Sequence, residues 1–148
     1  MISINRYSVK QVRESIGRYD LEKIITSPND VIKLAQTIGL EDEAQEKFVI
    51  ATLNSKNEIA GLHVIAIGSL NSAIVHPREV FKAALLNNAA SLICIHNHPS
   101  GDPTPSNEDI EITKRLKKVG DIMGIPLVDH VIIGSNNRYI SMKEKCIF

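Results

Sequence analysis

The sequence has few of the residues that mark specialised protein classes. Only two of its 148 residues are cysteine, and Cys94 and Cys146 belong to no CxxC pair and to no cluster of cysteine and histidine. We therefore expect reduced thiols with a structural role, and neither a disulfide framework nor a cysteine-based zinc finger. The sequence also lacks a glycine-rich phosphate loop, an internal repeat and a low-complexity segment. These absences exclude several common architectures and leave an ordinary globular domain.

An excess of charge and long apolar runs are missing as well. Lys and Arg total 17, and so do Asp and Glu, so no net positive field attracts phosphate backbones or anionic membranes. No run approaches the ~18 apolar residues of a membrane span, and the first 20 residues lack the apolar stretch of a signal peptide. We predict a soluble, cytoplasmic protein with no membrane partner, and the composition gives nucleic acid no support as a ligand.

The apolar pattern predicts one domain in which helices alternate with strands. With 43% hydrophobic residues, the chain is large enough to bury a core, and we divide it into an N-terminal extension, residues 1–26, and a domain, residues 27–148. Capping residues and prolines predict three helices, which begin near Pro28, Pro77 and Ser106. We expect Leu85 on the apolar face of the second helix and Met123 on that of the third.

The strands are expected between these helices. The segments KFVIATLN and IAGLHVIAIGSL predict an antiparallel hairpin, and SLICI predicts a central strand that is covered on both faces. IPLVDHVIIG and RYISM predict the last two strands. The fold class is therefore α/β or α+β, with one mixed sheet flanked by helices.

Two histidines follow the predicted central strand directly, in the segment HNHPSGDPTPSNED. Side chains two residues apart in a strand lie about 7 Å apart on the same face, so His96 and His98 can converge on one ion while Asn97 points away. No cysteine lies nearby to complete a closed structural site. We therefore predict a zinc site with one oxygen ligand and an open position for water, which is typical of catalysis.

Asp109 is the best candidate for the oxygen ligand, although Asp102 and Glu108 are also available. Prolines and Gly101 turn the loop, and Asp109 stands three residues after Ser106, in the first turn of the next helix. Ser106 and Asp109 also read as a capping box, which would explain both residues without a metal. Capping does not explain two histidines at strand spacing immediately before the loop, so we favour the metal site.

A hydrolytic zinc site also needs a base that accepts a proton from the activated water. The sequence offers five glutamates for this role, and their spacing does not decide among Glu41, Glu43, Glu46, Glu58 and Glu79.

Several other polar residues are expected to be structural. We interpret His63 as a histidine of the sheet, His76 as part of the turn into a helix, and the pair Asp129 and His130 as groups that support the site from behind. Lys114, Arg115, Lys117 and Lys118 are expected on the solvated face of the third helix.

Three segments together resemble the RadC branch of the JAB/MPN superfamily, whose metal-bearing members carry a JAMM motif. These segments are EKFVIATLNSKNEI, HPREVFKAALLNNAASLICIHNHPSGDPTPSNEDI and LVDHVIIG, and the resemblance covers about residues 27 to 145. It implies the JAB/MPN architecture, which is similar to that of cytidine deaminases, with a single, largely antiparallel sheet flanked by helices. The HxHP motif followed by SxxD is the most specific part of the resemblance.

The resemblance also implies roles for individual residues. His96, His98 and Asp109 match the zinc ligands, and Glu46 matches the general base, with Glu43 as the alternative. Ser106 matches the serine that stabilises the oxyanion. The implied function is a zinc metallopeptidase of the JAMM type, in which metal-activated water cleaves a peptide or isopeptide bond of an unknown protein or peptide substrate.

Two further hypotheses belong to other functional classes. The literal letters HNH and the family's name suggest a DNA-repair nuclease or a DNA-binding accessory protein. HNH nucleases, however, spread their histidine and asparagine over a longer finger, and the leader here shows no helix-hairpin-helix pattern. The third hypothesis is a catalytically inactive scaffold, because the superfamily includes members that only bind partners.

Overall fold

The computed structural model describes residues 4, 8, 12, 23–68 and 75–148. Most of the expected N-terminal extension therefore lies outside the described residues, as do Ser69 and Leu70 at the end of the second expected strand. The described helices are α1 (Pro28–Thr37), the 3-10 helix η1 (Leu40–Asp42), α2 (Pro77–Leu86) and α3 (Asn107–Met123). The described strands are β1 (Lys47–Leu53), β2 (Ile59–Ile67), β3 (Ser91–Asn97), β4 (Leu127–Ile133) and β5 (Tyr139–Ser141).

The five strands form one sheet in the order β2-β1-β3-β4-β5. β1 pairs antiparallel with both β2 and β3, β4 pairs antiparallel with β5, and β3 pairs parallel with β4. The expected hairpin and the mixed, mostly antiparallel α/β sheet are thus confirmed. A parallel pair needs a crossover connection, and α3 supplies it by returning the chain from the end of β3 to the start of β4.

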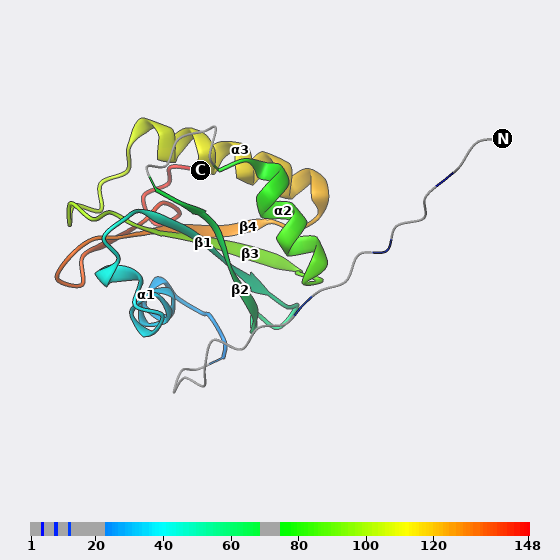
Figure 1. Ribbon diagram of the computed structural model, residues 1–148, viewed down its shortest axis with the longest axis horizontal. Helices are drawn as coiled ribbons and strands as arrows, with labels where there is room; N and C mark the ends of the chain where they lie inside the picture. Colours follow the sequence, from blue (N-terminus) through cyan, green and yellow to red (C-terminus); the bar gives the residue numbers. More distant parts are fainter. Residues whose placement is uncertain (1–3, 5–7, 9–11, 13–22, 69–74) are drawn as a thin grey trace.

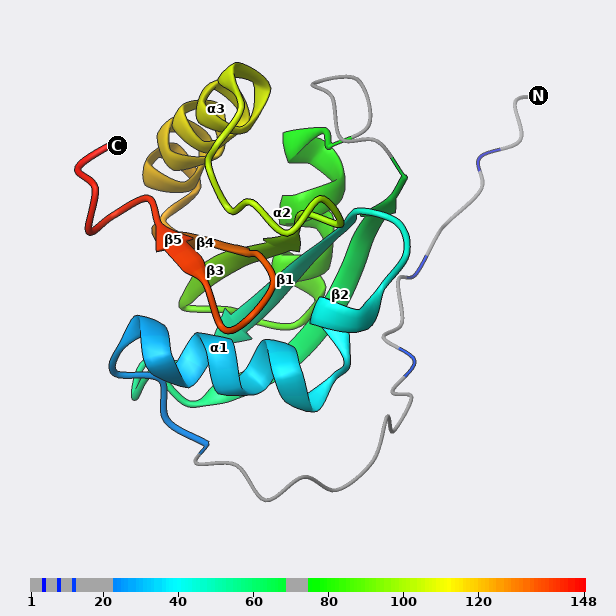
Figure 2. The same cartoon turned by 90° about the vertical axis from the view of Figure 1, so that its left-hand side faces the viewer.

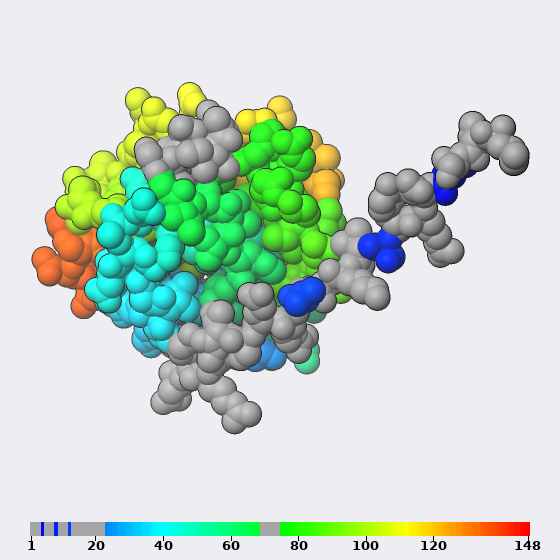
Figure 3. Space-filling view, in the orientation of Figure 1, coloured from blue at the N-terminus to red at the C-terminus, as the bar shows by residue number. Residues whose placement is uncertain are grey.

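Helices cover both faces of this sheet. α1 lies on one face, and α2 and α3 lie on the other (Figure 1), an arrangement that is seen edge-on in Figure 2. In the space-filling view, the cyan residues of α1 and of the segment that follows it lie beside the green residues of β2 and α2 (Figure 3). Alternate residues of β3 point to the two cores: Cys94 belongs to the core under α2 and α3, and Ile93 and Ile95 to the core under α1.

β3 is the strand with the most complete burial, since all seven of its residues are buried. The expected central strand is therefore confirmed. Cys94 is a free thiol with no exposed surface, and burial raises its pKa, so it remains a neutral core residue. Cys146 is free and exposed.

The helix starts follow the expected capping chemistry. In α1 the Asp30 carboxylate accepts a hydrogen bond from the Ser27 backbone N–H at 2.9 Å, and Pro28 occupies the first turn. α3 ends at Gly124, whose φ of +71° is a left-handed conformation that glycine adopts without strain. No helix in the described ranges has the length and apolar character that a membrane crossing requires.

Two expected core positions are wrong. Leu85 is 51% exposed and Met123 is 41% exposed, whereas Val80, Phe81 and Ala84 form the buried stripe of α2. At about 100° per residue, Leu85 lies about 140° around the helix from Val80 and about 40° beyond Phe81, so it falls just outside the buried stripe. Met123 belongs to the expected stripe of α3 but lies in the last turn, where the helix leaves the core.

Candidate metal centre

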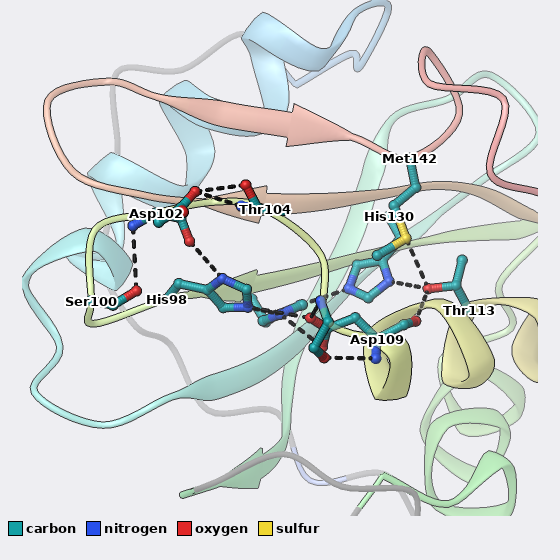
Figure 4. A network of polar contacts seen from close by, with 10 residues as sticks. His98, Ser100, Asp102, Thr104, Asp109, Thr113, His130 and Met142 are labelled. Carbon is teal, nitrogen blue, oxygen red and sulfur yellow. Dashed lines mark hydrogen bonds and ion pairs between the residues drawn. The ribbon is translucent and has the colours of Figure 1, made fainter.

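Three side chains that are suited to bind a metal ion meet at one end of β3. His96 is in β3, His98 follows that strand, and Asp109 lies in the first turn of α3. One ligand atom from each lies within 4.8 Å of the others, and His96 and Asp109 are buried. The structure thus brings together the three residues that the sequence suggested as metal ligands. The close view in Figure 4 shows His98 and Asp109 turned toward this point.

The separations of these atoms suit a small tetrahedral ion. Nε2 of His96 lies 3.0 Å from Nε2 of His98, and the Asp109 oxygens Oδ1 and Oδ2 lie 3.3 Å and 3.4 Å from those two nitrogens respectively. Zinc ligands held at about 2.0 to 2.1 Å with tetrahedral angles lie about 3.3 to 3.4 Å from one another. Two imidazole nitrogens and one carboxylate therefore fit zinc in both spacing and chemistry, with one coordination position left over.

The other two acids considered as ligands lie on the surface. Asp102 is exposed, and its Oδ1 accepts hydrogen bonds from the backbone N–H and the hydroxyl of Thr104. Glu108 is exposed on α3. Neither belongs to the group formed by His96, His98 and Asp109.

The Nδ1 atoms of both histidines already have partners. His98 donates from Nδ1 to the backbone carbonyl of Asp102 at 2.8 Å, because a carbonyl can only accept. His96 Nδ1 contacts Nε2 of His130 at 2.7 Å. With its Nδ1–H committed to a carbonyl, neutral His98 keeps a lone pair on Nε2, the atom that faces the other ligands.

Asp109 has two separate functions in the structure. Its Oδ2 accepts from the backbone N–H of Ser106 at 2.7 Å, and the Ser106 hydroxyl accepts from the backbone N–H of Asp109 at 3.1 Å, so the expected capping box is present. Burial would raise the pKa of the Asp109 carboxyl, but the close approach of the His96 and His98 rings outweighs burial and holds that pKa well below its usual range. Capping fixes the rotamer, and the ionised carboxylate remains directed at the two rings.

The two histidines lie in different electrostatic environments. Complete burial lowers the pKa of His96, whereas the neighbouring Asp109 carboxylate raises the pKa of His98, whose side chain retains some exposed surface. His96 is thus favoured as a neutral ring, the form that binds metals.

Glu46 is placed beside this group by the strand register. Phe48 pairs with His96 across β1 and β3, and Glu46 directly precedes β1, so it enters the sheet at the edge where His98 follows β3. The negative charge of Glu46 contributes to raising the pKa of both His96 and His98.

The other four glutamates considered for the role of base have other positions or partners. Glu43 forms an ion pair with Lys47, Glu58 binds Lys23, Glu79 binds Lys82, and Glu41 is exposed in η1.

Asn97 has a role that the sequence did not indicate. Its side chain points away from the histidines and is buried, and its Nδ2 donates to the backbone carbonyls of Glu43 at 3.3 Å and Gln45 at 3.1 Å. Its Oδ1 accepts from the backbone N–H of Lys47 at 2.7 Å. The side-chain amide of Asn97 thus holds the segment that contains Glu46 against the end of β3 through three hydrogen bonds. A polar residue at the end of an apolar strand was the only signal of this role in the sequence.

The loop after His98 is supported from the turn between β4 and β5. The carbonyl of Gly101 accepts from the Ser135 backbone N–H at 3.0 Å and from Arg138 Nη2 at 2.8 Å. Gly101 has a φ of +83°, and a side chain there would collide with the Ser135 hydroxyl. A Cβ at Gly134 would lie 2.5 Å from the Gly101 carbonyl oxygen. Both glycines are needed for this close approach.

The remaining polar residues have structural contacts, although the Asp129 carboxylate binds the β5 side of the sheet and not the histidines that it was expected to support. His63 Nε2 contacts Asn87 Oδ1 at 3.2 Å, and His76 accepts from the Arg78 backbone N–H at the start of α2. Asp129 is buried and accepts from the Ser141 hydroxyl at 2.6 Å. Lys114, Arg115 and Lys118 are exposed on α3, and Lys117 pairs with Asp121.

Comparison with known proteins points to one family. The model of the RadC-like JAB domain matches residues 25–147. A UPF0758 protein of Caldanaerobacter subterraneus subsp. tengcongensis is 56% identical over 121 residues, which make up 82% of this chain and 51% of that protein.

Two other relatives agree with this match. UPF0758 proteins of Halalkalibacterium halodurans and of Listeria monocytogenes serovar 1/2a are 55% and 51% identical, over 82% and 92% of this chain and 52% and 60% of their own lengths. The chain therefore spans about half the length of these curated relatives.

Proposed function

The chain belongs to the RadC-like JAB domain family, and from this membership and the geometry of the site we propose that it is a zinc-dependent hydrolase that cleaves a peptide or isopeptide bond. The observation that carries the proposal is the meeting of two imidazole nitrogens and one carboxylate at 3.0 to 3.4 Å. Three ligands with one position left over are typical of catalytic zinc, whereas structural zinc has four protein ligands.

His96, His98 and Asp109 would hold the ion. Zinc bound there would polarise the amide carbonyl and lower the pKa of a water molecule to about 7. In the reaction, the water oxygen bonds to the carbonyl carbon, the C–N bond breaks, and the leaving nitrogen gains a proton. Glu46, which enters the sheet at the edge where His98 follows β3, would accept the proton from water and pass it to the leaving amine.

Ser106 would donate to the oxygen on which negative charge develops. Its hydroxyl accepts the Asp109 N–H through a lone pair, so its own proton remains available, and the side chain is exposed at the start of α3. A donor aimed at developing charge lowers the barrier of such reactions. The capping bond fixes the direction of this donor.

The test is a metal analysis combined with an amide-cleavage assay. The chain, purified without a polyhistidine tag, should contain about one zinc per molecule and should hydrolyse members of a peptide and isopeptide library. The double variant His96→Ala/His98→Ala should lose both properties. His63→Ala, which removes a half-buried histidine from β2, is the matched control and should retain both.

Other results would point to the alternative functions. Equal zinc content in the wild type and the double variant would exclude the site. Zinc without cleavage of any amide would favour a scaffold. DNA affinity that falls steeply with salt would favour the nucleic-acid class, which the balance of 17 basic and 17 acidic residues does not support.

A further inference from the structure

We propose that Thr113 and His130 are positioning residues that set the tautomer of His96 and thereby leave its Nε2 lone pair free for the metal. This inference rests on the proposed zinc site. It is carried by a chain of short contacts behind His96 in which every group is buried, and part of this chain is visible in Figure 4.

This series of hydrogen bonds begins at the backbone carbonyl of Asp109, which can only accept a hydrogen bond. The Thr113 hydroxyl lies 2.6 Å from the Asp109 carbonyl oxygen, one helical turn earlier in α3. It also lies 2.6 Å from Nδ1 of His130 and 3.1 Å from Sδ of Met142. A hydroxyl has one proton but two lone pairs, and threonine in a helix commonly donates to the carbonyl four residues back. Thr113 can therefore donate to Asp109 and accept from His130.

The next two links follow from the chemistry of neutral imidazole, in which one nitrogen donates and the other accepts. If His130 donates from Nδ1 to Thr113, its Nε2 must accept. That nitrogen lies 2.7 Å from Nδ1 of His96, which must then donate. The proton of His96 is thus on Nδ1, and its Nε2, 3.0 Å from Nε2 of His98, has a lone pair. Both rings have no exposed surface, so water cannot supply a different partner.

Phe48 keeps the two rings in the orientation that this chain requires. Its ring stacks on His96 at a centroid distance of 5.9 Å and meets His130 edge-on at 5.3 Å. Phe48 is itself buried in β1. The rings therefore cannot turn to exchange their nitrogens without displacing a packed side chain.

Reversing the direction of donation along these hydrogen bonds shows what Thr113 contributes. If the hydroxyl donated to His130, then His130 would donate to His96, and Nε2 of His96 would bear a hydrogen where the metal should bind. The metal-binding direction needs an acceptor for the His130 Nδ1–H, and the Thr113 oxygen is that acceptor. Without it, metal binding would leave a buried N–H with no partner.

The test compares zinc affinity in Thr113→Val and Thr113→Ser with that of the wild type. Valine has nearly the same shape but no acceptor, so the zinc Kd should rise ten- to hundredfold, as is typical when an outer partner of a metal-binding histidine is lost. Serine restores the hydroxyl and should bring the Kd back to within about threefold of wild type. Thr37→Val is the matched control, because Thr37 also donates to a carbonyl four residues back but lies on α1, and its Kd should be unchanged.

Histidine ¹⁵N spectra of the zinc-loaded wild type give a second readout that a purely structural role would not affect. They should show the His130 proton on Nδ1. A proton on Nε2 of His130, or a Thr113→Val Kd within twofold of wild type, would overturn the inference while leaving the proposed function intact. A wild-type chain that binds no zinc would overturn both. If Thr113→Val does not fold, Thr113→Ala removes the same acceptor and replaces it.

Discussion

At the scale of the residue, Glu46 and Glu43 differ in the charged groups with which their carboxylates interact. Glu43 forms an ion pair with Lys47, whereas the negative charge of Glu46 acts on both His96 and His98. The sequence left these two glutamates as alternatives for the base. The position of Glu46 near the two histidines favours it, and the choice stays a prediction.

Substitution of these two glutamates tests the assignment. Glu46→Gln should reduce amide hydrolysis by at least about a hundredfold, as is typical for the loss of a general base, and should leave zinc content near one per chain. Glu43→Gln removes a partly exposed ion pair and should change the rate less than about threefold. Rates from the peptide library, with zinc measured on the same samples, give the comparison. A reduced hydrolysis rate in Glu43→Gln, together with a wild-type rate in Glu46→Gln, would make Glu43 the general base.

The sequence suggested the three candidate ligands and a supporting position for His130, but not the individual contacts that hold the rings in place. His96, His98 and Asp109 are close in sequence, and strand and helix periodicity suffices to bring them together. The contact between His130 and His96 joins two strands through the parallel register, in which His130 pairs with Cys94. The sequence of α3 does not show that Thr113 contacts His130, because that contact depends on how the helix packs on the sheet.

At the scale of the element, capping residues and the period of the apolar residues identified β1, β3 and α3. The errors at Leu85 and Met123 occurred where a helix offers more apolar residues than its packing partners can cover. Apolar character alone does not determine which side of α2 meets the sheet. That choice depends on the register with which the helix docks, which is a tertiary property.

The Asn97 amide should stabilise the connection between the β1 entry segment and β3. Asn97→Ala removes three hydrogen bonds to backbone groups and leaves them without that partner, so the free energy of unfolding should fall by about 1 to 3 kcal/mol. Urea denaturation of the metal-free protein measures this loss. Asn107→Ala, which removes an exposed amide from α3, is the control and should change stability by less than about 0.5 kcal/mol. Equal stability of the two variants would contradict the role of Asn97.

The start of α1 should give the fold a dependence on acid. Hydrogen bonding from the Thr26 backbone N–H is the main reason why the pKa of Asp30 lies below its usual value near 3.8. A lowered carboxyl pKa contributes stability above the unfolded value and loses it as the pH falls through the folded one.

Wild type should therefore exceed Asp30→Asn in unfolding free energy by about 0.5 to 1 kcal/mol at pH 7. The two should converge as the pH falls below about 3.8, the ordinary aspartate value. Urea titrations between pH 7 and pH 3 test the trend. A difference that stays constant over this range would show that the charge of Asp30 contributes nothing.

At the scale of the whole molecule, the proposed ion would link the sheet to the helical layer formed by α2 and α3, because it would join the end of β3 to the first turn of α3. A ligand that binds only the folded state stabilises it by about 2.7 kcal/mol at a hundred times its Kd. Zinc at that ratio should therefore raise the Tm by several degrees in calorimetry, and EDTA should remove the gain.

Asp109→Asn provides the matching variant for this experiment. Asparagine can still accept the Ser106 N–H through its amide oxygen, so the α3 cap survives while the charge on the metal side is lost. The metal-free variant should unfold close to the wild type, and the Tm gain with zinc should largely disappear. A full gain in Asp109→Asn would mean that the ion stabilises the protein from another place.

The anchor on Gly101 has a consequence for the comparison and engineering of related chains. The turn at residues 134–138 supplies the donors that hold the Gly101 carbonyl, although it touches none of the three ligands. Lengthening this surface hairpin, ordinarily a permissive site for insertions, should loosen the loop that carries His98. Sequence variation there is therefore informative about the loop that follows His98 at the same edge of the sheet, and protein engineers who graft new loops onto this scaffold should choose a different hairpin.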